Sequence, residues 1–180
     1  MHDRLMALAA VMLLGTSALA SEQSGPWWMT ETFKPSKGSI AGILAKDIDS
    51  TWTKVLPLSK ALLSREAQRY LETIPYGIHL SLDGDFNEDR IADRAIVGVY
   101  EGASGEKGRF VLILTREASR AWKKVFLGKH EGTSGFSYIT SDGSTLGWSE
   151  CFECDAGEGI VWTKEKGYQF EVVSDEESGE

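Results

Sequence analysis

The chain has 180 residues, of which 27 are Asp or Glu and 19 are Lys or Arg, so its formal net charge at pH 7 is −8. This charge disfavours nucleic acid and anionic lipid surfaces as partners, and it suits cationic partners or divalent cations. The sequence has no phosphate-binding loop, no dinucleotide fingerprint and no H-E-x-x-H motif, so it predicts none of the functions that depend on them.

The first twenty residues have the three parts of a secretory signal peptide. Arg4 lies near the start, an apolar run follows from Leu5 to Leu14, and Ala18-Leu19-Ala20 forms a small-residue cleavage site. The apolar run is too short to span a bilayer. We therefore expect residues 1–20 to be removed and the protein to be exported to the periplasm or the extracellular space, without a stable membrane anchor.

The remainder of the chain divides by composition into three parts. Residues 21–38 predict an irregular lead-in whose Trp27-Trp28 pair packs back onto the domain, with a carbohydrate or peptide platform as the alternative. Residues 39–173 are long enough for a single domain with its own core. Residues 174–180 are acidic and predict a disordered tail.

Two amphipathic helices are predicted at the start of this domain. Apolar side chains recur at steps of three and four residues from Ile40 to Val55, and again from Leu62 to Ile74. Pro57 should end or kink the first helix, and the second should end before Pro75. Residues 39–74 are therefore expected to form a helical segment.

Beyond Gly77 the sequence predicts β-structure. Short apolar or alternating runs are separated by Gly-rich turns, and their connections suit antiparallel hairpins. The run 109–116 is apolar on both faces and should lie centrally, whereas 168–173 alternates and should be half exposed. The fold class predicted is α+β, with an N-terminal helical segment packed on a mostly antiparallel β-sheet or small β-sandwich. The expected strands are 77–82, 92–100, 109–116, 121–129, 136–140, 144–150, 159–164 and 168–173.

An acidic loop lies between the first two of these strands. Counted from Asp85, side chains with oxygen atoms stand at positions 1, 3, 5 and 9, namely Asp85, Asn87, Asp89 and Asp93. A Ca²⁺ ion takes six to eight oxygen ligands, and a tightly curled loop supplies them from alternate side chains and a backbone carbonyl, here that of Ile91. The spacing predicts a calcium-type loop.

The stretch GDFNEDRIADRAIV resembles the calcium loop of FG-GAP and VCBS-type repeats, whose pattern is D-x-N-x-D-G-x-x-D followed by an apolar strand. The resemblance implies that Asp85, Asn87, Asp89 and Asp93 are side-chain ligands of a structural Ca²⁺ and that the carbonyl of Ile91 is a further ligand. It covers about sixteen of the 180 residues, in one copy. Members of that family stack many copies into a β-propeller, so the resemblance implies a loop and not an architecture.

Two residues depart from the family pattern. Arg90 replaces the Gly that follows the third ligand, and Glu88 replaces the Gly at position 4. In related loops the Gly after the third ligand takes a positive φ, which a non-Gly residue adopts at a cost of about 1 kcal/mol. Arg90 and Arg94 are also close enough in sequence to pair with the carboxylates. The alternative to a metal site is therefore a loop stapled internally by Arg90 to Asp85 or Asp89.

Cys151 and Cys154 are the only cysteines. In an exported chain, two cysteines three residues apart favour a structural disulfide, which needs Cα atoms within about 7 Å and hence a turn at 151–154. A redox dithiol, half of a zinc site and free thiols are the alternatives. The negative charges of Glu150, Glu153 and Asp155 oppose thiolate formation and so disfavour a redox role.

No catalytic residues are predicted, because no G-x-S-x-G or other nucleophile motif occurs. The function predicted is that of an exported, non-catalytic binding protein whose partner is an extracytoplasmic protein or a glycan. One version is an inhibitor or immunity-type protein that plugs an enzyme with a polar loop, 101–108 or 131–135.

Two enzymatic functions remain as alternatives. The first is an exported hydrolase acting on glycan or peptide, which would need His79 or His130 in a cleft close to a serine or to two carboxylates. The second is a thiol oxidoreductase at Cys151 and Cys154.

Overall fold

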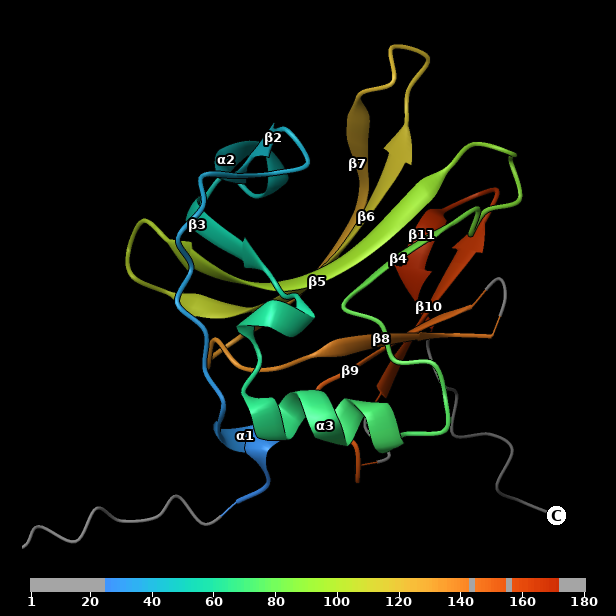
Figure 1. Cartoon of the computed structure of the whole chain (residues 1–180). Coiled ribbons are helices and arrows are strands. Elements are labelled where there is room, and N and C mark those ends of the chain that lie inside the picture. The colour runs from blue at the N-terminus through green and yellow to red at the C-terminus, as the bar shows by residue number, and fades with distance from the viewer. Residues whose placement is uncertain (1–24, 143–144, 155–156, 172–180) are drawn as a thin grey trace, which may run out of the picture.

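The computed structural model describes residues 25–142, 145–154 and 157–171 (Figure 1). The predicted signal peptide and acidic tail lie outside this range. None of the helices in the described part of the chain is long and apolar enough to cross a bilayer. In chain order the elements are α1 (Trp27–Thr30), β1 (Ser39–Ile40), β2 (Ile43–Leu44), α2 (Ala45–Ile48), β3 (Trp52–Pro57), the 3₁₀ helix η1 (Lys60–Leu62), α3 (Arg65–Thr73), β4 (Ser81–Gly84), β5 (Asp93–Gly102), β6 (Lys107–Arg116), β7 (Trp122–Glu131), β8 (Tyr138–Ser141), β9 (Leu146–Ser149), β10 (Gly157–Thr163) and β11 (Gly167–Phe170).

The described structure is mostly antiparallel β-sheet with few helices. A five-stranded sheet has the order β3-β5-β6-β7, with β4 paired to β5, and a four-stranded sheet has the order β11-β10-β9-β8. β6 lies between β5 and β7 and is buried from Phe110 to Leu114. The prediction that the doubly apolar run 109–116 lies centrally is confirmed, because neither of its faces is left to solvent.

The five-stranded sheet is covered on both faces. On one face, Val97, Val111 and Ile113 share a buried cluster with Trp148 and Ile160 of the four-stranded sheet. α1 and α3 close the same cluster, and Figure 1 shows both helices beside the four-stranded sheet. The opposite face is covered by the segment from Ile40 to Val55. This two-sided burial gives a small protein two hydrophobic clusters on one sheet.

The first predicted helix, from Ile40 to Val55, is wrong. The chain instead forms a two-stranded hairpin whose turn holds Ala41 and Gly42 at positive φ, then the short α2, then β3. A β-bulge between Trp52 and Lys54 shifts the register of β3. Trp52 and Val55 therefore both face the core although they are three residues apart, a spacing that imitates the helical period.

The second predicted helix and the strand predictions agree better with the structure. α3 spans Arg65–Thr73, and its N-cap Ser64 accepts a hydrogen bond from the Ala67 backbone N–H at 3.2 Å. Each expected strand after Gly77 corresponds to one of β4 to β11 with shifted ends. In the lead-in, Trp28 is buried and Trp27 packs on Tyr70 and Phe136, so the aromatic pair folds back onto the domain as predicted.

Asp49 ties the segment before β3 to the far edge of the five-stranded sheet. Its carboxylate accepts hydrogen bonds from the backbone and side chain of Thr51, and from Lys129 Nζ at 2.8 Å. Partial burial opposes ionisation, but the hydrogen bonds from Lys129 and Thr51 outweigh it and hold the pKa of Asp49 at about 2. Asp49 therefore stabilises the fold above its ordinary pKa, and this contribution is lost as the pH falls through about 2.

We predict that Asp49→Asn lowers the free energy of unfolding by about 1 kcal/mol at pH 7, after allowing for solvent screening of a surface pair. The difference from the parent should shrink towards pH 2, where the parent carboxyl is protonated as well. Urea unfolding at pH 7, 4 and 2.5 measures this. Asp47→Asn, at an exposed position on α2, is the control and should have little effect. A difference for Asp49→Asn that stays constant across the pH range would contradict the assignment.

Candidate functional site

The acidic loop connects β4 to β5, and its two ends are paired in the sheet. Gly84, the last residue of β4, is the register partner of Asp93, the first residue of β5. Phe86 turns back from the loop and is buried in the core cluster between the sheets. A Cβ atom on Gly84 would overlap the Phe86 ring, so the close approach needs glycine there. The loop is thus anchored at its neck by β-pairing and by one aromatic side chain.

Within the loop, side-chain oxygens face backbone N–H groups. Asp85 accepts from the N–H groups of Asp89 (Oδ1, 3.0 Å) and Arg90 (Oδ2, 2.8 Å). Asp89 accepts from the Ile91 N–H at 2.7 Å and from Asn87 Nδ2 at 2.9 Å. Asn87 Oδ1 accepts from the Asp89 N–H at 3.2 Å. The predicted ligands at positions 1, 3 and 5 therefore turn inward on one curled backbone.

The two residues that depart from the family pattern both have left-handed backbones. Glu88 has φ of 59° and Arg90 has φ of 67°. These are the positions at which the resembling loops carry glycine. A non-Gly residue takes this conformation at a cost of about 1 kcal/mol. At both positions the backbone therefore lies in the region that favours glycine, although neither residue is glycine.

Asp93 is fully buried. Its Oδ2 accepts hydrogen bonds from the Phe86 N–H at 3.1 Å and from the Tyr168 hydroxyl at 2.7 Å. Its Oδ1 is shielded from solvent and has no hydrogen-bond partner within the described residues. Burial, then the bond to Asp93 and the charges of Asp93, Asp89 and Asp85, raise the pKa of Tyr168, so this hydroxyl stays protonated and donates.

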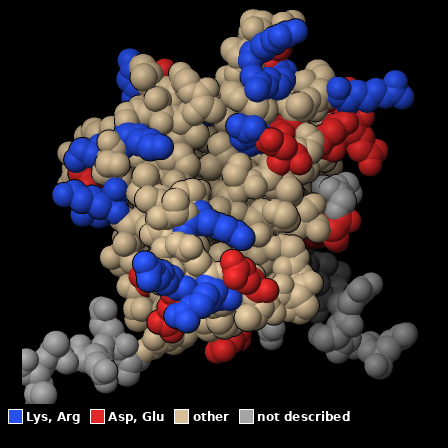
Figure 2. Space-filling model, in the orientation of Figure 1, with Lys and Arg blue, Asp and Glu red and all other residues tan. Residues whose placement is uncertain are grey.

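The arginines do not neutralise the loop. Arg94 pairs with Asp83, outside the ligand set, through Nε–Oδ1 at 2.5 Å and Nη2–Oδ2 at 2.8 Å. No ion pair in the described part of the chain joins Arg90 to Asp85 or Asp89, because only the backbone N–H of Arg90 contacts Asp85. In the described structure the loop is therefore paired internally through backbone N–H groups, including that of Arg90, and not through the Arg90 side chain. Acidic side chains gather at the upper right of Figure 2, where the loop lies in Figure 1.

The donor chemistry of the loop fits a hard cation. Its groups are carboxylate, amide and carbonyl oxygens, and each carboxylate oxygen that accepts one N–H retains a lone pair. As they stand, no three His, Cys, Asp or Glu side chains among the described residues are gathered closely enough to hold a metal. A bound cation would have to draw the side chains of Asp85, Asn87, Asp89 and Asp93 towards one point, with the carbonyl of Ile91 completing the set.

The cysteines form the predicted disulfide. Cys151 and Cys154 are bonded, with Cα atoms 5.5 Å apart, in the turn that follows β9. The Cys151 carbonyl accepts from the Tyr138 hydroxyl at 3.0 Å. Between the cysteines, Phe152 inserts among rings of α1, α3 and β8. Its ring centroid lies 4.7 to 5.8 Å from those of Trp27, Trp28, Tyr70, Phe136 and Tyr138. The turn closed by the disulfide therefore positions Phe152 in this aromatic cluster.

One histidine lies near two carboxylates, the arrangement that the hydrolase alternative requires. His130 Nδ1 is 2.9 Å from Glu150, and its Nε2 is 3.0 Å from Glu158. The ring also packs on Trp148 with centroids 4.5 Å apart, and Arg109 pairs with Glu150. Both ring nitrogens therefore have a carboxylate within hydrogen-bonding distance. The cluster joins β6 and β7 to the β9–β10 region across the two sheets.

The two polar loops proposed as a plug come together. The Gly132 N–H donates to the Lys107 carbonyl at 2.9 Å. Together with residues 32–35 they wall a hollow of about 450 Å³. The two loops and residues 32–35 therefore surround one hollow at this end of the molecule.

The sequence matches no model of a protein family, and no curated protein and no solved structure is significantly similar to it. The function therefore has to be inferred from the geometry of the chain itself. Sequence reasoning missed Tyr168, whose hydroxyl comes from a strand 75 residues away. It also missed a hollow beside the loop, since only the fold brings β10 there. Nothing in the local sequence signals either feature.

Proposed function

We propose that this chain is an exported, non-catalytic binding protein in which the loop 85–93 holds a structural Ca²⁺ ion. Asp85, Asn87, Asp89 and Asp93 would supply side-chain oxygens and Ile91 its carbonyl. The disulfide would stiffen the opposite part of the four-stranded sheet. The partner would be an extracytoplasmic protein or glycan, with an inhibitor or immunity-type protein as one version.

The observation that carries the calcium proposal is the buried carboxylate of Asp93. An unpaired, solvent-shielded oxygen on a buried carboxylate is strongly unfavourable unless a positive charge or a donor compensates it. No arginine or lysine in the described residues pairs with Asp93. A divalent cation in the loop would compensate both this oxygen and the neighbouring carboxylates.

The location of the loop supports a structural role for the ion. The two ends of the loop are held together by the pairing of β4 with β5. Tyr168 links Asp93 to β11 of the other sheet. A cation bound there would hold the loop and both sheets in one arrangement. It would leave little room for a reacting group, so catalysis is not implied.

A calcium titration of the melting temperature tests this proposal. We expect EDTA to lower the melting temperature and added Ca²⁺ to raise it by several degrees, because a ligand specific for the folded state stabilises it by about 2.7 kcal/mol at a hundredfold excess over Kd. Asp89→Ala should abolish the rise. Glu117→Ala, at an exposed acidic residue in the β6–β7 turn, is the matched control and should keep it. If Ca²⁺ does not change the melting temperature of the parent protein, the metal site is refuted.

A further inference from the structure

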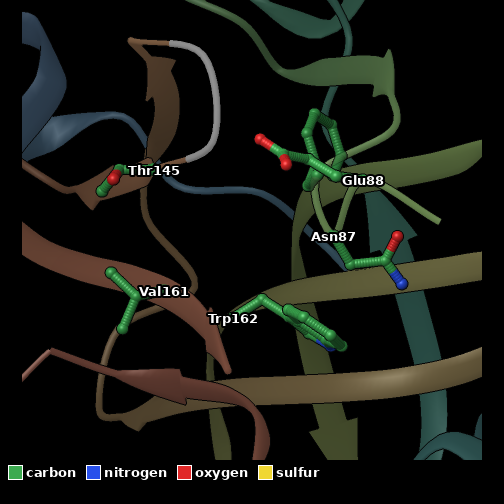
Figure 3. Close-up of a pocket in the computed structure, with 6 residues that line it drawn as sticks. Asn87, Glu88, Thr145, Val161 and Trp162 are labelled. Carbon is green, nitrogen blue, oxygen red and sulfur yellow. The ribbon is translucent and has the colours of Figure 1, made fainter. Parts of the chain in front are cut away.

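A hollow of about 310 Å³ lies between the acidic loop and β10. Phe86, Asn87 and Glu88 line it from the loop, and Thr145, Val161 and Trp162 line it from the four-stranded sheet (Figure 3). The size is at the lower end of that of small-molecule sites, and the lining mixes apolar side chains with a few polar groups, as such sites do.

The aromatic wall of this hollow is held next to the calcium-type loop by sheet register. Trp162 pairs with Tyr168 across β10 and β11, and directly paired residues have their side chains on the same face. Tyr168 reaches Asp93, so Trp162 stands beside the loop. Trp162 is 36 % exposed, so a ligand can reach it from solvent.

The acidic wall is Glu88, which is strained and unpaired. Its backbone is left-handed, with φ of 59°, and it is not one of the predicted ligands. Its exposed carboxylate makes no hydrogen bond or ion pair with any described residue, whereas Asp83, Asp85 and Asp89 are all engaged. In Figure 3, Glu88 projects over the hollow on the loop side, facing the side of Thr145 and Val161. Glu88 lines the hollow and has no partner within the described residues, so its carboxylate is available to a ligand there.

We infer that this hollow binds an organic cation, the guanidinium or ammonium group of an Arg or Lys side chain presented by a protein partner. The inference rests on the proposed binding function and names the chemistry of the partner. A cation is attracted by the face of a tryptophan and by a free carboxylate, and no Lys or Arg is among the residues that line the hollow. The net charge of −8 also favours a positively charged partner.

A comparison of a charged and an uncharged probe tests whether the hollow binds a cation or a neutral ligand such as a sugar. The probe is Nα-acetyl-arginine amide, and its matched control is Nα-acetyl-citrulline amide, which has nearly the same shape without the charge. Binding to the ¹⁵N-labelled protein in excess Ca²⁺ is followed through the indole N–H signal of Trp162, assigned with Trp162→Phe. We expect the Trp162 signal to shift on addition of the arginine compound, and the citrulline compound to bind at least about fivefold more weakly.

Two variants locate the site. Glu88→Gln should weaken binding of the arginine probe about fivefold, whereas Glu72→Gln on α3 should leave it unchanged. Trp162→Leu, followed through the backbone amides of Glu88 and Val161, should abolish it. Equal binding of the citrulline compound, unchanged affinity in Glu88→Gln, or a response to N-acetylglucosamine in place of the arginine compound would each overturn the inference.

The two proposals fail separately. Glu88→Gln should keep the Ca²⁺-dependent rise in melting temperature, because Glu88 is not a ligand. Loss of arginine binding with an intact calcium response would therefore refute only the cation site. Arginine binding without any calcium response would refute only the metal loop.

Discussion

Asp93→Ala is expected to lower the free energy of unfolding by about 3 to 5 kcal/mol in the presence of Ca²⁺. The substitution removes the acceptor of the Phe86 N–H and of the Tyr168 hydroxyl, and it leaves one buried donor and one partly buried donor without a partner. It also removes the only buried member of the proposed ligand set. Denaturant unfolding at saturating Ca²⁺ measures the loss.

Asp93→Asn distinguishes a cation site from a site that is only hydrogen-bonded. The amide oxygen can accept both bonds made by Oδ2, so the shape and the acceptor are retained while the charge is removed. If the loop holds Ca²⁺, the parent should be the more stable protein in Ca²⁺, and the variant should equal or exceed it in EDTA, where the buried carboxylate is uncompensated. A parent that is more stable than Asp93→Asn by the same margin in both solutions would show that Asp93 needs no cation.

The candidate site was predictable from sequence only as far as local spacing reaches. All five predicted ligands lie within residues 85–93. Their spacing alone indicates that alternate side chains turn inward towards backbone N–H groups. The partners that complete the site, Tyr168 and Trp162, come from β10 and β11, and no pattern in residues 83–100 indicates them. Their positions depend on how the two sheets pack, which is a long-range property.

The fold was also predictable only in part. The main error, a helix predicted where β3 lies, has a physical cause. A strand that is buried on both faces, such as β6, has a continuous apolar run, and such a short run predicts a strand from the sequence. β3 has no such run. Its buried side chains Trp52 and Val55 are three residues apart in the sequence, and the bulge places both of them on the core face. The stacking of Trp52 on Tyr100, with centroids 4.3 Å apart, holds this strand against β5. A periodicity argument cannot separate a bulged strand from a helix when the apolar spacing is three residues.

Phe152→Ala is the second large effect expected, a loss of about 3 kcal/mol in the free energy of unfolding. Its ring contacts α1, α3 and β8 together, so its removal leaves a cavity where three elements meet. Thermal or urea unfolding measures the loss. Tyr76→Ala, at a ring that is 49 % exposed, is the control and should change the free energy of unfolding by less than about 0.5 kcal/mol.

The disulfide should be coupled to this ring. Cys151→Ser with Cys154→Ser opens a very short loop, which removes about 2 kcal/mol by the chain-entropy estimate. The turn closed by the disulfide also positions Phe152, so part of the ring's contribution depends on the bond. When Phe152→Ala is added to the cysteine pair, the total loss should therefore be smaller than the sum of the two separate losses. Strict additivity would mean that the aromatic cluster holds Phe152 without the disulfide, and that the bond acts only on the unfolded chain.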